Sequence, residues 1–311
     1  MDKSMEVLER TLQANITEQR RARRWRIAFR LVTLAVVVVV LQQKNLLTLA
    51  GDEGGGAQTA KIEVNGPIEE GASASSENVK RSLVAAFRDS KTRGVILEIN
   101  SPGGSPVHSG QIYDEIRRQR ALHPDVKVYA VVSDLAASGA YYIASAADAI
   151  YADKASLVGS IGVTAATFGF VDLMTKLGVE RRAYTSGQHK AFLDQFQPRN
   201  EEETRFWQSV LSTTHQQFIA AVKDGRGDRL KAADHPELFS GLIWTGEQAL
   251  QLGLVDKLGD TDFVAREVIQ QDRVVDFTRK ENPFDRFATK LGASIASEVS
   301  QMVGFSGPRL Q

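Results

Sequence analysis

The segment from Val131 to Asp153 contains a serine in a turn of small residues, which is the first candidate for chemistry. It reads VVSDLAASGAYYIASAADAIYAD, and we expect an apolar strand to end at Val132 and a helix to begin at the serine. The Ser138 hydroxyl is sterically accessible beside Gly139, and helix N-terminal amides can stabilise developing negative charge. This pattern is typical of a nucleophile, although the same place is also the commonest one for a helix N-cap.

Two glycine-containing loops follow other predicted strands. Gly103 and Gly104 lie in the sequence INSPGGSP, where their bare N–H groups can approach a ligand closely, as an oxyanion hole requires. The same stretch also fits an ordinary turn in which Ser105 caps a helix that begins at Pro106. In the second loop, VGSIGV, Ser160 lies between two glycines. That loop either lines a substrate groove or is a packing turn, and the sequence does not separate these roles.

A nucleophilic serine needs a general base, and Lys190 is the candidate in the loop TSGQHKAF. A surface lysine is ordinarily only solvated, but this one lies near the end of a predicted strand. A Ser/His/Asp triad is possible in principle, and His189 is the histidine that competes with the lysine. The other histidines have no fitting partner pattern; they are His108, His123, His215 and His235.

Composition excludes several classes of function. The chain has no cysteine, which excludes disulfides, thiolate catalysis and Cys-ligated metal. It also lacks a HExxH-type spacing, so we expect no metal and no other cofactor. Its 38 basic and 38 acidic residues give a net charge of zero, and no nucleic-acid partner is expected. With 311 residues, 42% of them hydrophobic, the chain can form a sizeable core.

The N-terminal region predicts a membrane anchor. Residues 1–26 end in a dense run of arginines and are expected to be cytoplasmic, because basic residues before an apolar segment stay inside. The apolar run from Leu31 to Leu41 is shorter than the roughly 20 residues that span a bilayer. We therefore extend the transmembrane segment to residues 27–49, with arginines reaching back to the headgroups. A cleaved signal peptide ending at Ala50 is the alternative.

Beyond residues 50–59, a flexible linker by composition, strand-like and helical runs alternate. This alternation predicts an α/β domain over residues 60–272, with parallel strands and crossover helices, followed by a C-terminal extension, residues 273–311. The expected strands are residues 61–68, 94–99, 126–132, 149–152 and 179–184. The expected helices are residues 75–92, 106–123, 169–177, 201–222, 246–252 and 261–271. The helix over 201–222 has an apolar face that contains Phe206, Val210, Leu211, Phe218 and Val222.

Taken in order, the motifs resemble those of the signal peptide peptidase A family of serine proteases, which includes the bacterial inner-membrane SppA and SohB types. They are the basic-flanked apolar segment, EINSPGG, DLAASGAYYIA, GSIGV, SGQHK and WTGEQALQLGLVDKLG. The resemblance covers roughly residues 60 to 270. Its specificity comes from the whole set of motifs, because no single motif would be sufficient. It implies a ClpP/crotonase-like fold and a Ser/Lys dyad in place of a triad.

By position, the resemblance implies a role for each site residue. Ser138 matches the nucleophile and Lys190 the general base, while Ser160 matches a residue that hydrogen-bonds the lysine. The amide of Gly139, with that of Gly103 or Gly104, matches the oxyanion hole. The chain departs from the family in having Ala140 where a second glycine is usual and His189-Lys190-Ala191 where Tyr-Lys-Ser is common. These departures put substrate preference and tuning of the dyad in doubt more than activity.

The family also implies partners and a location. We expect peptide substrates such as apolar signal-peptide remnants, contact with the lipid bilayer, and a homo-oligomer in which the lysine reaches the serine within one copy or from its neighbour. The expected location is the bacterial inner membrane, with a single pass and an extracytoplasmic protease domain. The alternatives are a catalytically silent membrane-anchored scaffold and a crotonase-type acyl-CoA enzyme. Against the second alternative, the sequence has no obvious basic site for a nucleotide phosphate.

Overall fold

A computed structural model describes residues 21, 23–25, 27–34 and 56–279. The chain divides into two units, residues 1–56 and residues 57–311. In the first unit, residues 27–34 are helical and exposed. Within the described ranges, no helix is both long enough and apolar enough to cross a bilayer. Most of the predicted anchor and linker, residues 35–55, lies outside the described residues, as does the C-terminal extension from residue 280.

The second unit is built on one eight-stranded sheet with the order β6-β5-β3-β2-β1-β8. Strand β4 pairs with the first half of β3 and with β7, while β5 pairs with the last residues of β3. All pairs are parallel except β5 with β6. The strands are β1 (Gln58–Asn65), β2 (Thr92–Ser101), β3 (Lys127–Ala137), β4 (Ala149–Ala152), β5 (Leu157–Gly159), β6 (Ile243–Thr245), β7 (Lys257–Leu258) and β8 (Val274–Asp276).

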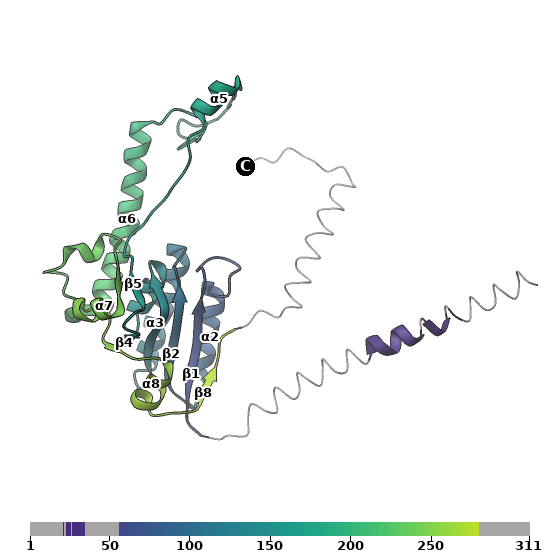
Figure 1. The fold of residues 1–311 in the computed structure, drawn as a ribbon, viewed down its shortest axis with the longest axis vertical. Helices are drawn as coiled ribbons and strands as arrows, with labels where there is room; N and C mark the ends of the chain where they lie inside the picture. The colour runs from purple at the N-terminus through teal and green to yellow at the C-terminus, as the bar shows by residue number, and fades with distance from the viewer. Residues whose placement is uncertain (1–20, 22, 26, 35–55, 280–311) are drawn as a thin grey trace, which may run out of the picture. The chain divides into compact units, whose positions relative to one another are not determined.

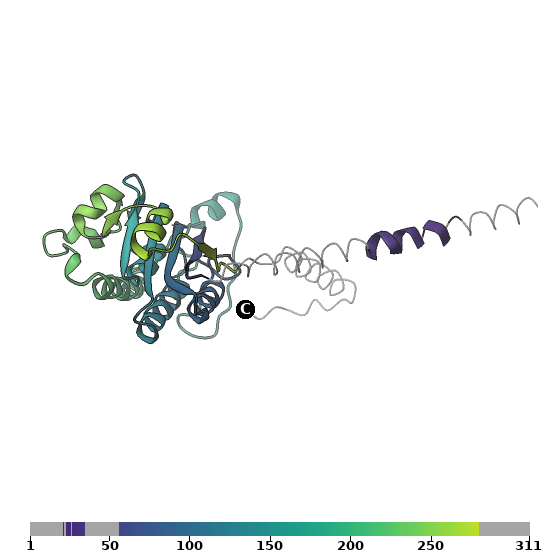
Figure 2. The same ribbon diagram turned by 90° about the horizontal axis from the view of Figure 1, so that it is seen from below.

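Helices cover both faces of this sheet, with α2 and α3 on one side and α8 on the other (Figures 1 and 2). Successive residues of β2 point to opposite faces, so Leu97 lies in the larger core with α2, α3, α4 and α6, whereas Ile96 packs against Val264 beyond α8. The helices are α2 (Ser76–Arg88), α3 (Pro106–Leu122), α4 (Gly139–Ser145), α5 (Val171–Leu177), α6 (Glu201–Arg226), α7 (Gly246–Leu252) and α8 (Thr261–Phe263), with a π-helical turn over Val264–Ile269.

Most of the predicted alternation of strands and helices is confirmed, and the differences have physical causes. The strand predicted over residues 179–184 was wrong: this stretch has no strand to pair with, and its Glu180 and Arg182 pair with each other at 2.9 Å. Strand β3 continues past Val132 to Ala137, because β2 and β5 supply pairing partners on both sides. The sheet also includes β8, which lies beyond residue 272.

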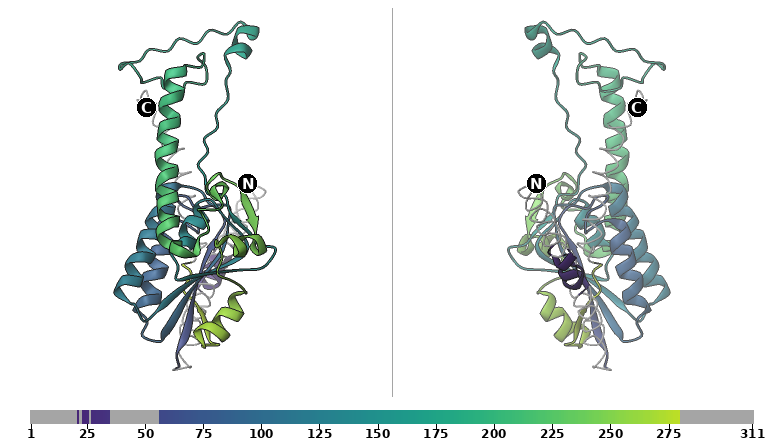
Figure 3. Two further views of the ribbon diagram at one scale, coloured as in Figure 1. Left: turned by 90° about the vertical axis from the view of Figure 1, so that its left-hand side faces the viewer. Right: turned by 90° about the vertical axis from the view of Figure 1, so that its right-hand side faces the viewer.

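Residues 164–212 form an arm that extends away from the sheet (Figure 3). The N-terminal part of helix α6 belongs to this arm. Helix α5 lies near the N-terminal end of α6, away from the sheet (Figure 1). Only the C-terminal part of the predicted apolar face, Phe218 and Val222, is buried in the core, together with the neighbouring Ile219. Phe206, which belongs to the same predicted face, is 60% exposed. The arm therefore presents apolar surface that the body of the domain does not cover.

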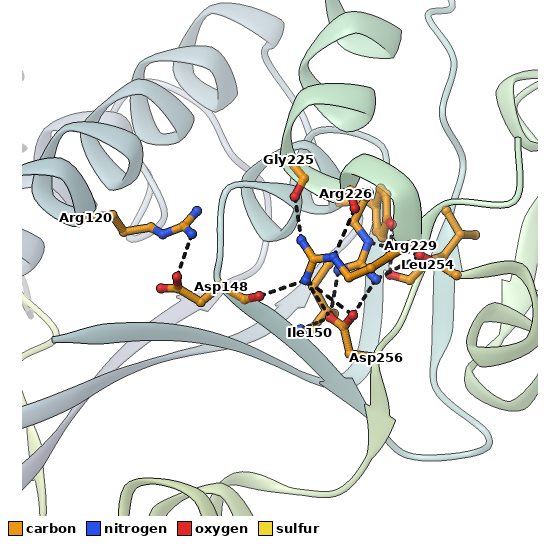
Figure 4. A network of polar contacts seen from close by, with 10 residues as sticks. Arg120, Asp148, Ile150, Gly225, Arg226, Arg229, Leu254 and Asp256 are labelled. Carbon is orange, nitrogen blue, oxygen red and sulfur yellow. Dashed lines mark hydrogen bonds and ion pairs between the residues drawn. The ribbon is translucent and has the colours of Figure 1, made fainter. Parts of the chain in front are cut away.

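A buried ion pair fixes the C-terminal end of α6 (Figure 4). The Arg226 guanidinium donates to both carboxylate oxygens of Asp256, at 2.7 and 2.9 Å, and also to the carbonyl of Gly253. Asp256 in turn accepts from the backbone N–H of Ile150 on β4, at 2.7 Å. Burial opposes ionisation of Asp256, but the hydrogen bonds and charge of Arg226 outweigh it and hold the pKa of Asp256 below its usual value. This network ties α6 to the sheet.

We expect Asp256→Asn to lower the free energy of unfolding by about 3–5 kcal/mol, because it leaves the buried Arg226 charge unpaired. Urea unfolding of the full chain followed by circular dichroism measures this change. The pair Glu77–Arg81 is exposed, so Glu77→Gln serves as the matched control and should leave stability unchanged. An equal effect of both substitutions would contradict the role given to the buried pair.

The same pair predicts a pH dependence. Because the pKa of Asp256 is lower in the folded chain than its unfolded value of about 3.9, its stabilisation is fully present above about pH 4. That contribution is lost as the pH falls through the folded pKa. Unfolding measured from pH 6 to pH 2.5 should show a steeper loss of stability for the natural chain than for Asp256→Asn.

Candidate active site

Three turns meet where the parallel strands β2, β3 and β5 end. Ser101 of β2 aligns with Ala136 of β3, and Ala137 aligns with Gly159 of β5. The residues that follow each strand are therefore neighbours, although they come from three separate parts of the sequence. Ligands of open parallel sheets bind at this carboxyl edge. The structure thus brings the Gly103–Gly104 turn, Ser138 and the loop after β5 to one place.

Ser138 joins β3 to α4 in a strained backbone conformation. Its φ is 54° and its ψ is −124°, which is uncommon for a residue other than glycine and costs on the order of 1–3 kcal/mol. The Ser138 N–H donates to the carbonyl of Gly159 at 2.8 Å, and its carbonyl accepts from the N–H of Tyr142 at 3.0 Å. Its hydroxyl makes no capping bond to α4. The N-cap alternative is therefore wrong, and the hydroxyl has no partner in the described part of the chain.

The two glycines before α3 have different roles. The N–H of Gly103 already donates to the Ser101 hydroxyl, at 3.1 Å. The N–H groups of Gly104 and Gly139 have no acceptor within the described residues, and the Gly104 nitrogen lies 3.3 Å from where a Cβ on Gly139 would be. Gly104 and Gly139 are thus the pair of donors available to an oxyanion. Ser105 does cap α3, because its hydroxyl accepts from the N–H of His108, so the predicted cap is confirmed.

A cavity of about 430 Å³ adjoins Ser138, between α3 and α6. Its wall is aromatic, because the Tyr142 ring stacks on Phe218 with a centroid distance of 4.9 Å. Burial and, less strongly, the negative charge of Asp114 raise the pKa of the Tyr142 hydroxyl. The lining residues are Gly104, Pro106, Val107, Gly110, Gln111, Asp114, Ser138, Gly139, Tyr142, Gly162, Val163, Thr214, Gln217 and Phe218.

Lys190 does not reach Ser138 within one copy of the chain. It is exposed in the arm, and its side chain has no hydrogen bond or ion pair among the described residues. Two residues later, Phe192 packs edge-on against Phe206 and Trp207 near the start of α6. The cavity first meets α6 at Thr214, about 10 Å further along that helix at 1.5 Å per residue. The competing His189 is exposed in the same loop.

Ser160 follows β5 with a φ of 52°, and its N–H donates to the carbonyl of Leu242 at 2.7 Å. The structure places it beside the Ser138 turn, but its hydroxyl contacts no described lysine. His215 was set aside at the level of sequence for lack of a partner, but its Nε2 lies 3.1 Å from the carbonyl of Ile161 in this loop. The positions 107, 110–111 and 114 lie on one face of α3 by helical spacing, and that pattern could have identified Asp114.

Comparison with protein families gives two matches. The model described as peptidase family S49 matches residues 120–275, and that described as Clp protease matches residues 57–156. The second match covers β1 to β4 and agrees with the observed parallel sheet. The predicted ClpP-like α/β fold is therefore confirmed.

The chain is also similar to individual proteins. The Na(+)/H(+) antiporter NhaA of Brucella melitensis is 50% identical over 178 residues, 57% of this chain, but the chain spans only 24% of that protein. The putative signal peptide peptidase SppA of Enterococcus faecium is 33% identical over 223 residues, which are 71% of this chain and 64% of that protein. Among solved structures, a membrane-bound stomatin-specific protease is 17% identical, covering 73% of this chain and 96% of its own, with a TM-score of 0.44.

We expect Gly103→Ala to reduce labelling of Ser138 by a fluorophosphonate probe by at least about 100-fold. An added Cβ would lie 2.6 Å from the Ala137 carbonyl and 2.7 Å from the Gly139 nitrogen, at a φ of 91°. The turn must shift, which moves an oxyanion donor away from the serine. Gly56→Ala is the matched control, because a Cβ there meets nothing within 4 Å. Full labelling of Gly103→Ala would contradict the geometry.

Proposed function

This chain belongs to peptidase family S49, a family of serine proteases, and we propose that it is a membrane-anchored endopeptidase whose nucleophile is Ser138. The observation that carries the proposal is the Ser138 hydroxyl itself. It is held in a strained turn without a hydrogen-bond partner among the described residues, beside the unengaged N–H groups of Gly104 and Gly139. A nucleophile beside preorganised donors is the arrangement that acyl transfer requires.

In the proposed reaction, Ser138 Oγ attacks the carbonyl carbon of a peptide bond while the Lys190 amine accepts the hydroxyl proton. The N–H groups of Gly104 and Gly139 stabilise the oxyanion. Lys190 then donates the proton to the leaving amine, and an acyl-enzyme remains. Water attacks the acyl group in a second round, which regenerates the serine. The amine must be uncharged to accept the proton, and burial against a neighbouring subunit favours that form.

We propose that Lys190 comes from a neighbouring copy of the chain. Within one copy the lysine lies on the arm, about two helical turns or more beyond the cavity, as the packing of Phe192 against Phe206 and Trp207 indicates. The arm also carries exposed apolar side chains, among them Phe168 and Tyr184, which are 77% and 90% exposed. Apolar surface of this kind is typical of a subunit interface. A head-to-tail contact would bring one copy's arm to the next copy's serine.

Mixing two inactive variants tests this arrangement. Ser138→Ala and Lys190→Ala should each abolish fluorophosphonate labelling and peptide hydrolysis. If the lysine acts between copies, assembling the two variants together in equal amounts restores about one quarter of the natural rate, because half the copies keep the serine and half their neighbours keep the lysine. Ser186→Ala, in the same loop, is the control and stays active. No recovery on mixing, with intact assembly, would show that the lysine acts within one copy.

The rival functions make different predictions. A silent scaffold is consistent with the separation of Lys190 from Ser138 in one copy, and it predicts no labelling of the assembled protein. A crotonase-type acyl-CoA enzyme needs a cation for the nucleotide phosphates, but the residues that line the cavity include no lysine, arginine or histidine. Labelling at Ser138 that depends on Lys190 would therefore favour the protease over both.

We further propose that residues 27–49 anchor the chain in the bacterial inner membrane, with the protease domain outside the cytoplasm. The basic run before the apolar segment supports this orientation. An extracytoplasmic site beside the bilayer suits apolar peptides derived from the membrane, such as signal-peptide remnants. Small residues around Ser138, including Gly104 and Gly162, leave room for an extended peptide.

The absence of cysteine allows a direct test of topology. A membrane-impermeant maleimide applied to intact spheroplasts should label Glu247→Cys, which is exposed on α7, but not Ser4→Cys before the arginine run. Both variants should react after the membrane is permeabilised. Deleting residues 1–49 should move the protein out of the membrane fraction. Labelling of Ser4→Cys in intact spheroplasts would reverse the proposed orientation.

A further inference from the structure

The cavity beside Ser138 has a carboxylate that the proposed reaction does not use. Asp114 lines it from α3, and its side chain forms no ion pair or hydrogen bond with any described residue. The neighbouring Arg117 is already paired with Asp224 at 3.0 Å. The lining includes no other charged residue, and Asp114 is exposed, so its carboxylate is accessible to a ligand from the solvent.

The position of Asp114 sets the length of ligand that can reach it. Helix α3 begins at Pro106, beside the oxyanion donor Gly104, and Asp114 lies about 12 Å along it at 1.5 Å per residue. An extended Lys or Arg side chain and the Asp114 side chain together bridge this distance. A shorter side chain next to the cleaved bond leaves the carboxylate unpaired.

The walls between Ser138 and Asp114 suit the stem of such a side chain. Tyr142 and Phe218 form a stacked aromatic surface, and Val107 and Val163 add apolar contacts. Lys and Arg bury their methylene stems against apolar surface while the charged head stays at a polar group. The Tyr142 hydroxyl lies close to where a Cβ on Gly110 would be, at 3.8 Å, so a larger residue at position 110 would narrow the groove.

We propose that Asp114 is a specificity-determining residue that selects peptides with Lys or Arg immediately before the cleaved bond. This inference rests on the proposed function, because it assigns the side-chain pocket of the same serine. It is compatible with membrane-derived substrates, since signal peptides carry basic residues before their apolar segment. Charge complementarity at a half-open site contributes specificity by favouring one side chain over its uncharged analogue.

Paired peptides that differ only in Lys or norleucine before the cleaved bond test the proposal. Norleucine keeps the aliphatic stem but lacks the charge. The assembled natural chain should cleave the Lys peptide with a kcat/KM at least about fivefold higher, the equivalent of roughly 1 kcal/mol. Asp114→Asn should bring the ratio close to one, mainly by lowering kcat/KM for the Lys peptide. Asp125→Asn, an exposed carboxylate beyond α3, is the control and keeps the ratio.

The outcomes separate this inference from the proposed function. Cleavage of both peptides at similar rates, or a Lys preference that survives in Asp114→Asn, would overturn the role of Asp114 and leave the protease intact. A preference that is reversed toward acidic peptides in Asp114→Lys would support it further. If neither peptide is cleaved and Ser138 resists the fluorophosphonate probe, both proposals fail together.

Discussion

Close contact between two backbone turns determines the candidate site. Gly103 packs so tightly against the Ala137–Gly139 backbone that any side chain there would collide with it. On its other side the same turn is fixed by Ile68, whose N–H donates to the Gly103 carbonyl and whose carbonyl accepts from Ser105. The turn is therefore held from two directions. Neither Gly104 nor Gly139 has an acceptor for its N–H among the described residues, and both glycines line the cavity beside the strained Ser138.

The body of the domain carries the candidate nucleophile, Ser138, and the arm carries the candidate base, Lys190. The Arg226–Asp256 pair holds α6 to β4, so that Phe218 stays over the cavity beside Ser138. Beyond the cavity the helix leaves the body, and the loop with Lys190 follows it. A base placed this far from its nucleophile makes the proposed activity depend on assembly. An isolated copy would then be inactive, which limits cleavage to the assembled protein.

The residues that line the cavity beside Ser138 determine which substrate side chains it can bind. Its small residues lie at the serine, its aromatic pair comes from α4 and α6, and its carboxylate, Asp114, lies halfway along α3. The three helices that form it are separated in sequence, but each is fixed by the same sheet. The fold therefore determines which side chains face the pocket, and these can discriminate between substrates by shape and charge.

The sequence alone determined the alternation of strands and helices, the turn that carries Ser138 and the family, because each is encoded in local patterns of apolar and small residues. The tertiary structure decided that Gly104 rather than Gly103 has an N–H available for an oxyanion, because the N–H of Gly103 already donates to the side chain of Ser101 on β2. It also showed that residues 179–184 form no strand, because pairing needs a neighbour that the arm lacks. The separation of Lys190 from Ser138 and the place of Asp114 likewise depend on how distant segments pack, which local patterns do not contain.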